Sequence, residues 1–292
     1  MGVRIISDSA SDISQELAGE WKIDILPLHI LFGEEEFLDG VTLSHTRFYE
    51  KLIETDVCPK TSQIPPFEYS SCFEKAAEAG DDVVCLTLSS GVSGCFQSAS
   101  LAAEETMKKC GNKIYVVDTK QFCISQFILI EAAVRLRDKG FSAEKIAQTI
   151  EAVRSRAHVI SVFNTLEYLK LGGRISSAAA AVGGLLSIKP VLTITDGQVD
   201  VIGKARGSRQ GNNLLNEFIA KTGIDLDLPF VFAYSGFSDR VLKKYISDCA
   251  ATYGLTDTDS VRIASVGAAI GTYSGPDAFA FAYFDSETSI AQ

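Results

Sequence analysis

Apolar runs without internal alternation recur in the first half of the chain, and amphipathic segments separate them. Such runs occupy residues 3–9, 83–88 and 113–119, and the amphipathic segment 124–140 follows the last of them. Continuous apolar strands are typical of a parallel sheet buried on both faces by helices. The sequence therefore predicts an N-terminal α/β domain with a mainly parallel sheet flanked by helices.

Two further segments of this half carry secondary-structure signals. The sequence "DISQELAGEW" at 12–21 predicts a helix with Asp12 as its N-cap and Gln15 completing a capping box. The sequence "IDILPLHILF" at 23–32 is another apolar, branched run.

The pattern changes after about residue 158. Strand-like pieces are now separated by longer helical or turn segments, and Asp196–Gly197 forms the favoured turn of a two-residue hairpin. A hairpin implies antiparallel pairing, so we expect a second α/β domain with a mixed sheet. The predicted domains are residues 1–158 and 159–292.

Composition excludes several classes of function. The net charge of −10 leaves no basic face for nucleic acid. The seven cysteines are scattered and never spaced C-x-x-C, which argues against a disulfide framework or a metal site and favours the cytoplasm. We see no signal peptide, and the weakly polar stretch 178–188 is far shorter than the roughly 20 residues that span a bilayer, so no stable membrane insertion is expected.

The segment "LSSGVSGCFQSA" at 88–99 is the most informative turn. It holds two glycines and four serines before a helix, without the lysine of a phosphate-binding loop. Backbone N–H groups, hydroxyls and a helix dipole together favour one compact anion, and a carboxylate fits. Alternatively, the turn merely caps its helix.

A catalytic interpretation of the same turn is also open. "GVSGC" approaches the G-x-S-x-G nucleophile motif, with Cys95 in place of the second glycine. A Ser93 nucleophile would need His29, His45 or His158 as its base. A serine-dependent acyl hydrolase or a small-acid phosphotransferase is therefore the alternative.

Several motifs in fixed order resemble the DegV family, bacterial proteins that bind fatty acids. The chain reads "DSASD" at 8–12, "PKTSQ" at 59–63, "SSGVSGCFQSA" at 89–99, "LEYLKLGGRIS" at 166–176 with "IKP" downstream, and "IGTYSGP" at 270–276. The resemblance covers nearly the whole chain. It implies two α/β domains with a long-chain fatty acid between them, no catalytic residue, and no cofactor or metal.

The resemblance also implies which residues lie near the carboxylate of the fatty acid. By position these are Thr61, Ser62, Ser93, Gly94, Arg174 and Tyr273. Tyr273 stands where the family has a histidine, and tyrosine cannot supply an imidazolium near neutral pH.

Some family members present the acid to a separate ATP-dependent fatty acid kinase subunit, which makes an acyl phosphate for phospholipid synthesis. The resemblance thus implies such a partner here. Arg206 and Arg209 in "GKARGSRQ" are candidates for docking it, and a solvated loop is the alternative interpretation. The glycines at 267, 271 and 275 predict close approach of another backbone or side chain.

Overall fold

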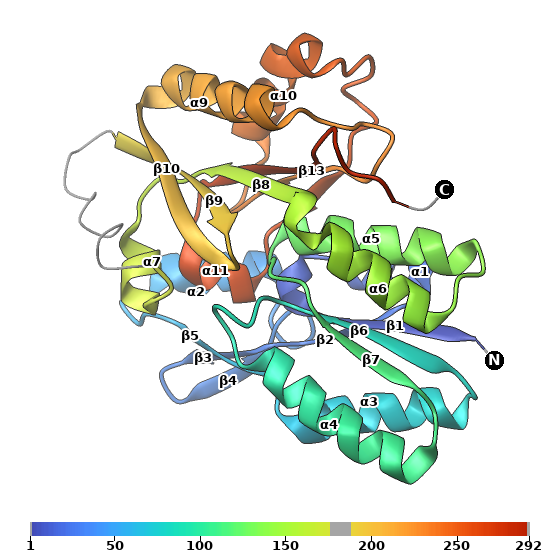
Figure 1. Ribbon diagram of the computed structural model, residues 1–292. Helices are drawn as coiled ribbons and strands as arrows, with labels where there is room; N and C mark the ends of the chain where they lie inside the picture. Colours follow the sequence, from blue (N-terminus) through green and yellow to red (C-terminus); the bar gives the residue numbers. More distant parts are fainter. Residues whose placement is uncertain (1, 176–187, 291–292) are drawn as a thin grey trace.

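A computed structural model describes residues 2–175 and 188–290, whose strands form three sheets with helices between and around them (Figure 1). Within these residues, no helix is both long and apolar enough to cross a membrane.

The first sheet is parallel and has the strand order β2-β1-β6-β7. Its strands are β1 (Val3–Asp8), β2 (Asp24–Leu26), β6 (Asp82–Thr87) and β7 (Ile114–Asp118). Helices α3 (Pro66–Glu78) and α4 (Cys95–Cys110) cover one face, while α1 (Gln15–Trp21), α5 (Ile124–Asp138) and α6 (Ala143–Val153) cover the other (Figure 1). The predicted parallel sheet flanked by helices is confirmed.

The second sheet is mixed, with six strands in the order β10-β9-β8-β13-β11-β12. Its strands are β8 (Ala157–Val162), β9 (Ile188–Thr195), β10 (Gln198–Arg206), β11 (Val231–Tyr234), β12 (Ile263–Ser265) and β13 (Phe279–Phe284). Only β11 and β12 pair in parallel. Helices α9 (Gly207–Thr222) and α10 (Arg240–Tyr253) cover its outer face, and α5 lies between the two large sheets (Figure 1).

The hairpin between β9 and β10 turns at the predicted dipeptide. Asp196 and Gly197 both have positive φ, 50° and 80°, which is the backbone that this turn requires. The mixed sheet and its hairpin are thus confirmed, while the division into domains at residue 158 stays a prediction.

A third, antiparallel sheet of three short strands was not anticipated. It has the order β4-β3-β5, formed by β3 (His29–Phe32), β4 (Glu35–Leu38) and β5 (Lys60–Ser62), and α2 (His45–Glu54) packs against it. The apolar run 23–32 therefore supplies strands to two sheets, divided near Pro27. Thr61 and Ser62 lie on a strand and not in a loop.

The prediction that Asp12 caps the first helix is wrong. Ser14 is the N-cap of α1, and its hydroxyl accepts a hydrogen bond from the Leu17 amide. Asp12 instead ends a short 3-10 helix, η1 (Ser9–Ser11), in the left-handed conformation. Its carboxyl group accepts a hydrogen bond from the amide of Gly267, 255 residues away.

Two short helices meet where the sheets come together, α7 (Glu167–Gly172) and α11 (Ala268–Ser274). A Cβ atom on Gly271 would lie 2.6 Å from a ring carbon of Phe48 in α2. A Cβ on Gly275 would lie 2.2 Å from the ring of Tyr168 in α7. The close approach predicted from these glycines is therefore confirmed.

Gly271→Ala should destabilise the protein, because its methyl group would overlap Phe48 and lie 2.8 Å from the Tyr49 hydroxyl. Overpacking of this kind costs about 1–3 kcal/mol, measurable by urea denaturation. Gly19→Ala in α1 is the control, since nothing lies within 4 Å of its new methyl group, and a gain of about 0.5–1 kcal/mol is expected there. Equal stability of the Gly271 variant and the unchanged protein would contradict the packing argument.

Candidate functional site

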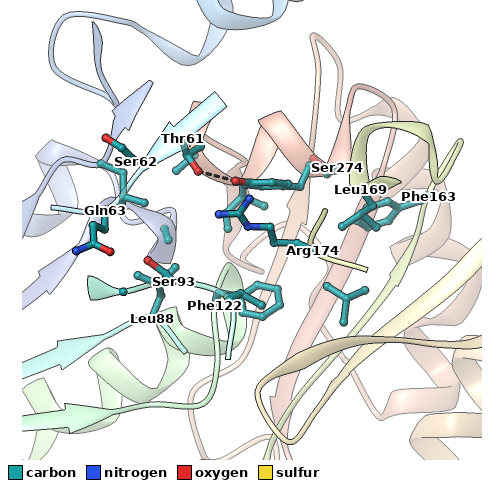
Figure 2. A pocket seen from close by; sticks show the side chains of 18 residues that line it. Thr61, Ser62, Gln63, Leu88, Ser93, Phe122, Phe163, Leu169, Arg174 and Ser274 are labelled. Atoms are coloured by element: carbon teal, nitrogen blue, oxygen red, sulfur yellow. Dashed lines mark hydrogen bonds between the residues drawn. The ribbon is translucent and has the colours of Figure 1, made fainter. Parts of the chain in front are cut away.

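All six residues implied by the family resemblance line one cavity. It lies where β5, the turn before α4, the end of α7 and the helix α11 meet (Figure 2). The six are Thr61, Ser62, Ser93, Gly94, Arg174 and Tyr273. The structure thus brings together segments far apart in the sequence, and their contact with a ligand stays a prediction.

Ser93 differs from its neighbours in the glycine turn. The hydroxyl of Ser89 donates to the carbonyl oxygen of Gly197 at 2.8 Å, and that of Ser90 donates to Asp118 Oδ2 at 2.5 Å. Ser93 lines the cavity, and its hydroxyl oxygen accepts a long bond of 3.3 Å from the Cys95 amide. The hydroxyl also lies within reach of the Cys95 thiol, but sulfur is a weak acceptor, so the proton can turn to a ligand.

A lysine does lie near this turn, but it is bound to Ser90 and Asp118. Lys120 Nζ is 2.9 Å from Asp118 Oδ2 and does not line the cavity. Burial would raise the pKa of Asp118, but hydrogen bonds from Ser90 and Lys120 outweigh it and lower the pKa. Arg174 is the one cationic side chain among the described residues of the cavity wall.

Tyr273 connects the two sides of the cavity. Its hydroxyl is 2.5 Å from Thr61 Oγ1, the hydrogen bond drawn as a dashed line in Figure 2. The Arg174 guanidinium lies 5.3 Å from the centre of the Tyr273 ring, while its Nη1 donates to the Gly172 carbonyl at 2.7 Å. Two hydroxyl groups and one guanidinium thereby converge from three chain segments.

Gln63 is a wall residue that the sequence analysis did not assign to the site. Its amide nitrogen donates to the Ser98 hydroxyl at 2.9 Å. A Cβ atom on Gly94 would lie 1.8 Å from Gln63 Oε1, so a side chain at position 94 would displace the Gln63 amide. Gln63 is the third residue of the "TSQ" motif, so the motif itself could have indicated it as a site residue.

A second, apolar cavity adjoins the first. The two share five wall residues, namely Phe122, Phe163, Val199, Ile270 and Ser274. The second cavity then runs over the inner face of the mixed sheet, where its wall includes Val159, Leu192, Ile194, Ala233 and Ala280. These residues gave no functional signal in the sequence, because they are indistinguishable from ordinary core residues.

The hydroxyl groups in the wall of the apolar cavity are bonded to backbone groups. Thr193 Oγ1 donates to the Val159 carbonyl at 2.7 Å, and Ser161 Oγ donates to the Leu192 carbonyl at 3.3 Å. The alcohol protons therefore point into the sheet, and the cavity presents a hydrocarbon surface. A polar end and an apolar extension together fit an amphiphile with a small anionic head group.

The hydrolase alternative lacks its base. Among the described residues, no histidine lines the cavity of Ser93. His29 contacts Glu36 and Glu68, and His158 contacts Asp285. His45 lies beside Gly267 at the start of α2.

The two candidate docking arginines do not line either cavity in the described structure. Arg206 is exposed at the end of β10, and Arg209 lies in the first turn of α9, where its side chain is outside the described residues. The segment is thus a strand end and a helix, not the loop considered in the alternative. Docking stays a prediction.

Comparison with known families identifies the chain. A model described as an uncharacterised protein of the DegV family matches residues 2–286. The chain belongs to the DegV family. A DegV domain-containing protein of Caldanaerobacter subterraneus subsp. tengcongensis is 33% identical over 278 residues, which cover 94% of this chain and 96% of that protein.

Solved DegV structures share the fold. A DegV family protein from Thermus thermophilus, described for its fatty acid binding, is 30% identical with a TM-score of 0.86, covering 98% of this chain and 100% of that chain. A stearic acid-binding protein from Eubacterium ventriosum is 27% identical with a TM-score of 0.84, covering 96% of this chain and 97% of that chain. The DegV fold thus covers nearly the whole chain.

Two buried carboxyl groups adjoin the site. Burial raises the pKa of Asp8 to about 7, although it accepts hydrogen bonds from the Leu88 amide and Gln126. Burial also raises the pKa of Asp12 to about 8, and hydrogen bonds from Gly267 and Cys123 offset this only in part. Both groups therefore bind a proton in the folded state at a pH where an unfolded aspartate, with a pKa of about 3.9, is ionised.

Asp12→Asn should flatten the pH dependence of stability. In the unchanged protein, Asp12 favours folding most below pH ~4, and this contribution is lost as the pH rises to the folded pKa of about 8. Each such group should make the free energy of unfolding fall by up to ~1.4 kcal/mol per pH unit between pH 5 and 7. The slope should be smaller in the variant, because the contribution of Asp12 is gone. Urea denaturation at several pH values measures the slope.

Asp118→Asn is the matched control for this experiment. Burial would raise the pKa of Asp118, but hydrogen bonds from Ser90 and Lys120 lower it below its ordinary value. Replacing it should leave the slope between pH 5 and 7 unchanged, because neither partner titrates in that range. The same slope in the Asp12 variant as in the unchanged protein would contradict a protonated Asp12.

Proposed function

We propose that this chain binds one long-chain fatty acid, with the carboxylate in the polar cavity and the tail in the apolar one. The observation that carries the proposal is the adjacency of a polar and an apolar cavity, which share five wall residues. The fatty acid binding of similar DegV proteins supports it. The ligand would lie between two domains, residues 1–158 and 159–292.

The carboxylate would be held chiefly by hydroxyl groups. Ser93 and the Gly94 amide would donate hydrogen bonds to it, with Ser62 beside them. The Thr61 and Tyr273 hydroxyls are bonded to each other, so one of them donates to the other and the second donates to the carboxylate. Arg174 supplies the positive charge at the cavity wall. Hydrogen bonds to a charged acceptor are stronger than neutral ones, so these groups fix the orientation of the head group.

The tail would supply most of the affinity. A C16 acid carries about 14 methylene groups, each contributing about 0.8 kcal/mol on burial, or roughly 11 kcal/mol before the costs of ordering. The inner face of the mixed sheet offers a hydrocarbon surface, because its hydroxyl groups are bonded to backbone carbonyls. A head-group site with a single arginine is therefore sufficient.

The chain would act as a carrier in the cytoplasm, and the chemistry on the acid would belong to a separate subunit. We expect an ATP-dependent fatty acid kinase as the partner that converts the bound acid to an acyl phosphate. The family resemblance supports this step, and Arg206 and Arg209 are its candidate docking residues. The cysteines are free thiols, as the cytoplasm requires.

Ser93→Ala should weaken binding of palmitate without weakening binding of hexadecanol, which lacks the carboxylate. Loss of one hydrogen bond to a charged group costs about 1.5–3 kcal/mol, so the dissociation constant for palmitate should rise at least about tenfold. Displacement of a fluorescent fatty acid from delipidated protein measures both constants.

Ser90→Ala is the matched control, because its hydroxyl lies in the same turn but is bound to Asp118 and Lys120. It should leave the affinity for palmitate unchanged. If palmitate binds no better than hexadecanol to the unchanged protein, and no fatty acid is found by mass spectrometry of the purified chain, the proposed function is wrong.

Tyr273→His should raise the rate at which a fatty acid kinase subunit phosphorylates the bound acid. An imidazolium near the carboxylate stabilises negative charge in a way that a neutral phenol does not. Acyl phosphate formation from ATP and protein-bound palmitate measures the rate, with palmitate affinity determined for both proteins. A wild-type rate equal to that of the variant would show that Tyr273 suffices for transfer.

A further inference from the structure

The helix α11 has its first amide groups satisfied by carboxyl groups from the opposite end of the chain. The Gly267 amide donates to Asp12 Oδ1 at 2.8 Å, the Ala268 amide to Asp39 Oδ1 at 2.8 Å, and the Ala269 amide to Asp39 Oδ2 at 3.2 Å. Helices usually obtain this cap from a side chain at their own N-cap position. Here the cap is supplied from more than 220 residues away.

This helix has no local cap, because its N-cap residue is Gly267. A Cβ atom on Gly267 would lie 2.9 Å from His45 Nε2 and 3.1 Å from Asp39 Oδ1. A side chain at the N-cap would therefore have to displace His45 or Asp39. Because unpaired helix amides are costly when buried, the position of the first turn of α11 depends on Asp39 and Asp12.

Asp39 is itself held in place from two directions. The Ser9 hydroxyl donates to its Oδ2 at 2.8 Å and accepts a hydrogen bond from the Leu28 amide at 3.0 Å. The Asp39 amide donates to the Leu28 carbonyl at 3.0 Å. Burial raises the pKa of Asp39, while the nearby His45, the Ser9 hydroxyl and the two helix amides oppose that rise.

The other end of the same helix carries the tyrosine of the polar cavity. α11 has only seven residues, so it moves as one rigid piece of about 10 Å. Ala269, Ile270, Tyr273 and Ser274 all face the cavity from it. A shift of its first turn would therefore displace the Tyr273 hydroxyl from Thr61, 2.5 Å away.

We propose that Asp39, assisted by Asp12, is a positioning residue that sets the place of the Tyr273 hydroxyl at the ligand carboxylate. The inference rests on the proposed function. Asp39 does not line the polar cavity, and it would act on the head group only through the position of α11. It should consequently affect recognition of the carboxylate and leave recognition of the tail unchanged.

The test compares palmitate with hexadecanol in Asp39→Asn. The carboxamide keeps one acceptor oxygen and turns an N–H group towards a helix amide, so the first turn of α11 must shift. The preference for palmitate over hexadecanol should fall about tenfold, the size of one lost hydrogen bond to a charged group. Affinity for hexadecanol should stay the same.

Two further variants separate positioning from general destabilisation. Asp285→Asn also removes a buried, hydrogen-bonded carboxylate, but Asp285 lies at the end of β13 and contacts His158 and Arg156. It should lower the melting temperature and keep the preference for palmitate. Ser9→Ala removes one hydrogen bond to Asp39 and leaves its carboxylate in place. If Asp39→Asn does not fold, the palmitate preference of Ser9→Ala tests the inference.

NMR of palmitate labelled with 13C at its carboxyl carbon gives an independent readout. The pKa of the bound carboxyl group should be higher in Asp39→Asn and Ser9→Ala than in the unchanged protein, because a donor to the carboxylate is misplaced. An unchanged palmitate preference and an unchanged carboxyl pKa in both variants would overturn the inference. A wild-type protein without any preference for palmitate would instead overturn the proposed function.

Discussion

Direct packing of glycine backbone against aromatic rings is the contact on which the cavity depends. Gly271 of α11 lies against Phe48, and Gly275 just beyond the helix lies against Tyr168. Gly172 at the end of α7 lies in turn against Tyr273. Rings packed on bare backbone leave no gap between these segments, since protein interiors are close-packed. The shape of the polar cavity therefore depends on the missing side chains of these three glycines as well as on the side chains that line it.

Sequence patterns predicted the structural features that are determined by residues close together in the sequence. Continuous apolar runs predicted the parallel sheet, and Asp196–Gly197 predicted the hairpin. The three-stranded sheet was missed because its strands have only three or four residues, too few for a pattern. The role of Asp12 was missed because its partner is 255 residues away. The six residues of the polar cavity came from the family motifs, whereas nothing distinguishes the apolar wall from ordinary core.

The electrostatics of the site agree with the composition of the chain. A protein of net charge −10 repels anions at long range, and Lys120 near the glycine turn is paired with Asp118. In the proposed function, attraction of a carboxylate would thus be local, through hydroxyl groups, one amide and Arg174. Such a site distinguishes one end of an amphiphile from the other, while burial of the tail provides the driving force.

Gln63 and Gly94 constrain each other across the polar cavity. The amide of Gln63 fills the space that any side chain at position 94 would need. A relative with a shorter residue at 63 would have room for alanine at 94, whereas one that keeps glutamine would have to turn that side chain away. The two positions should accordingly change together during evolution. The exposure of the Gly94 N–H group to the cavity then depends on the side chain at position 63, which lies on a different segment.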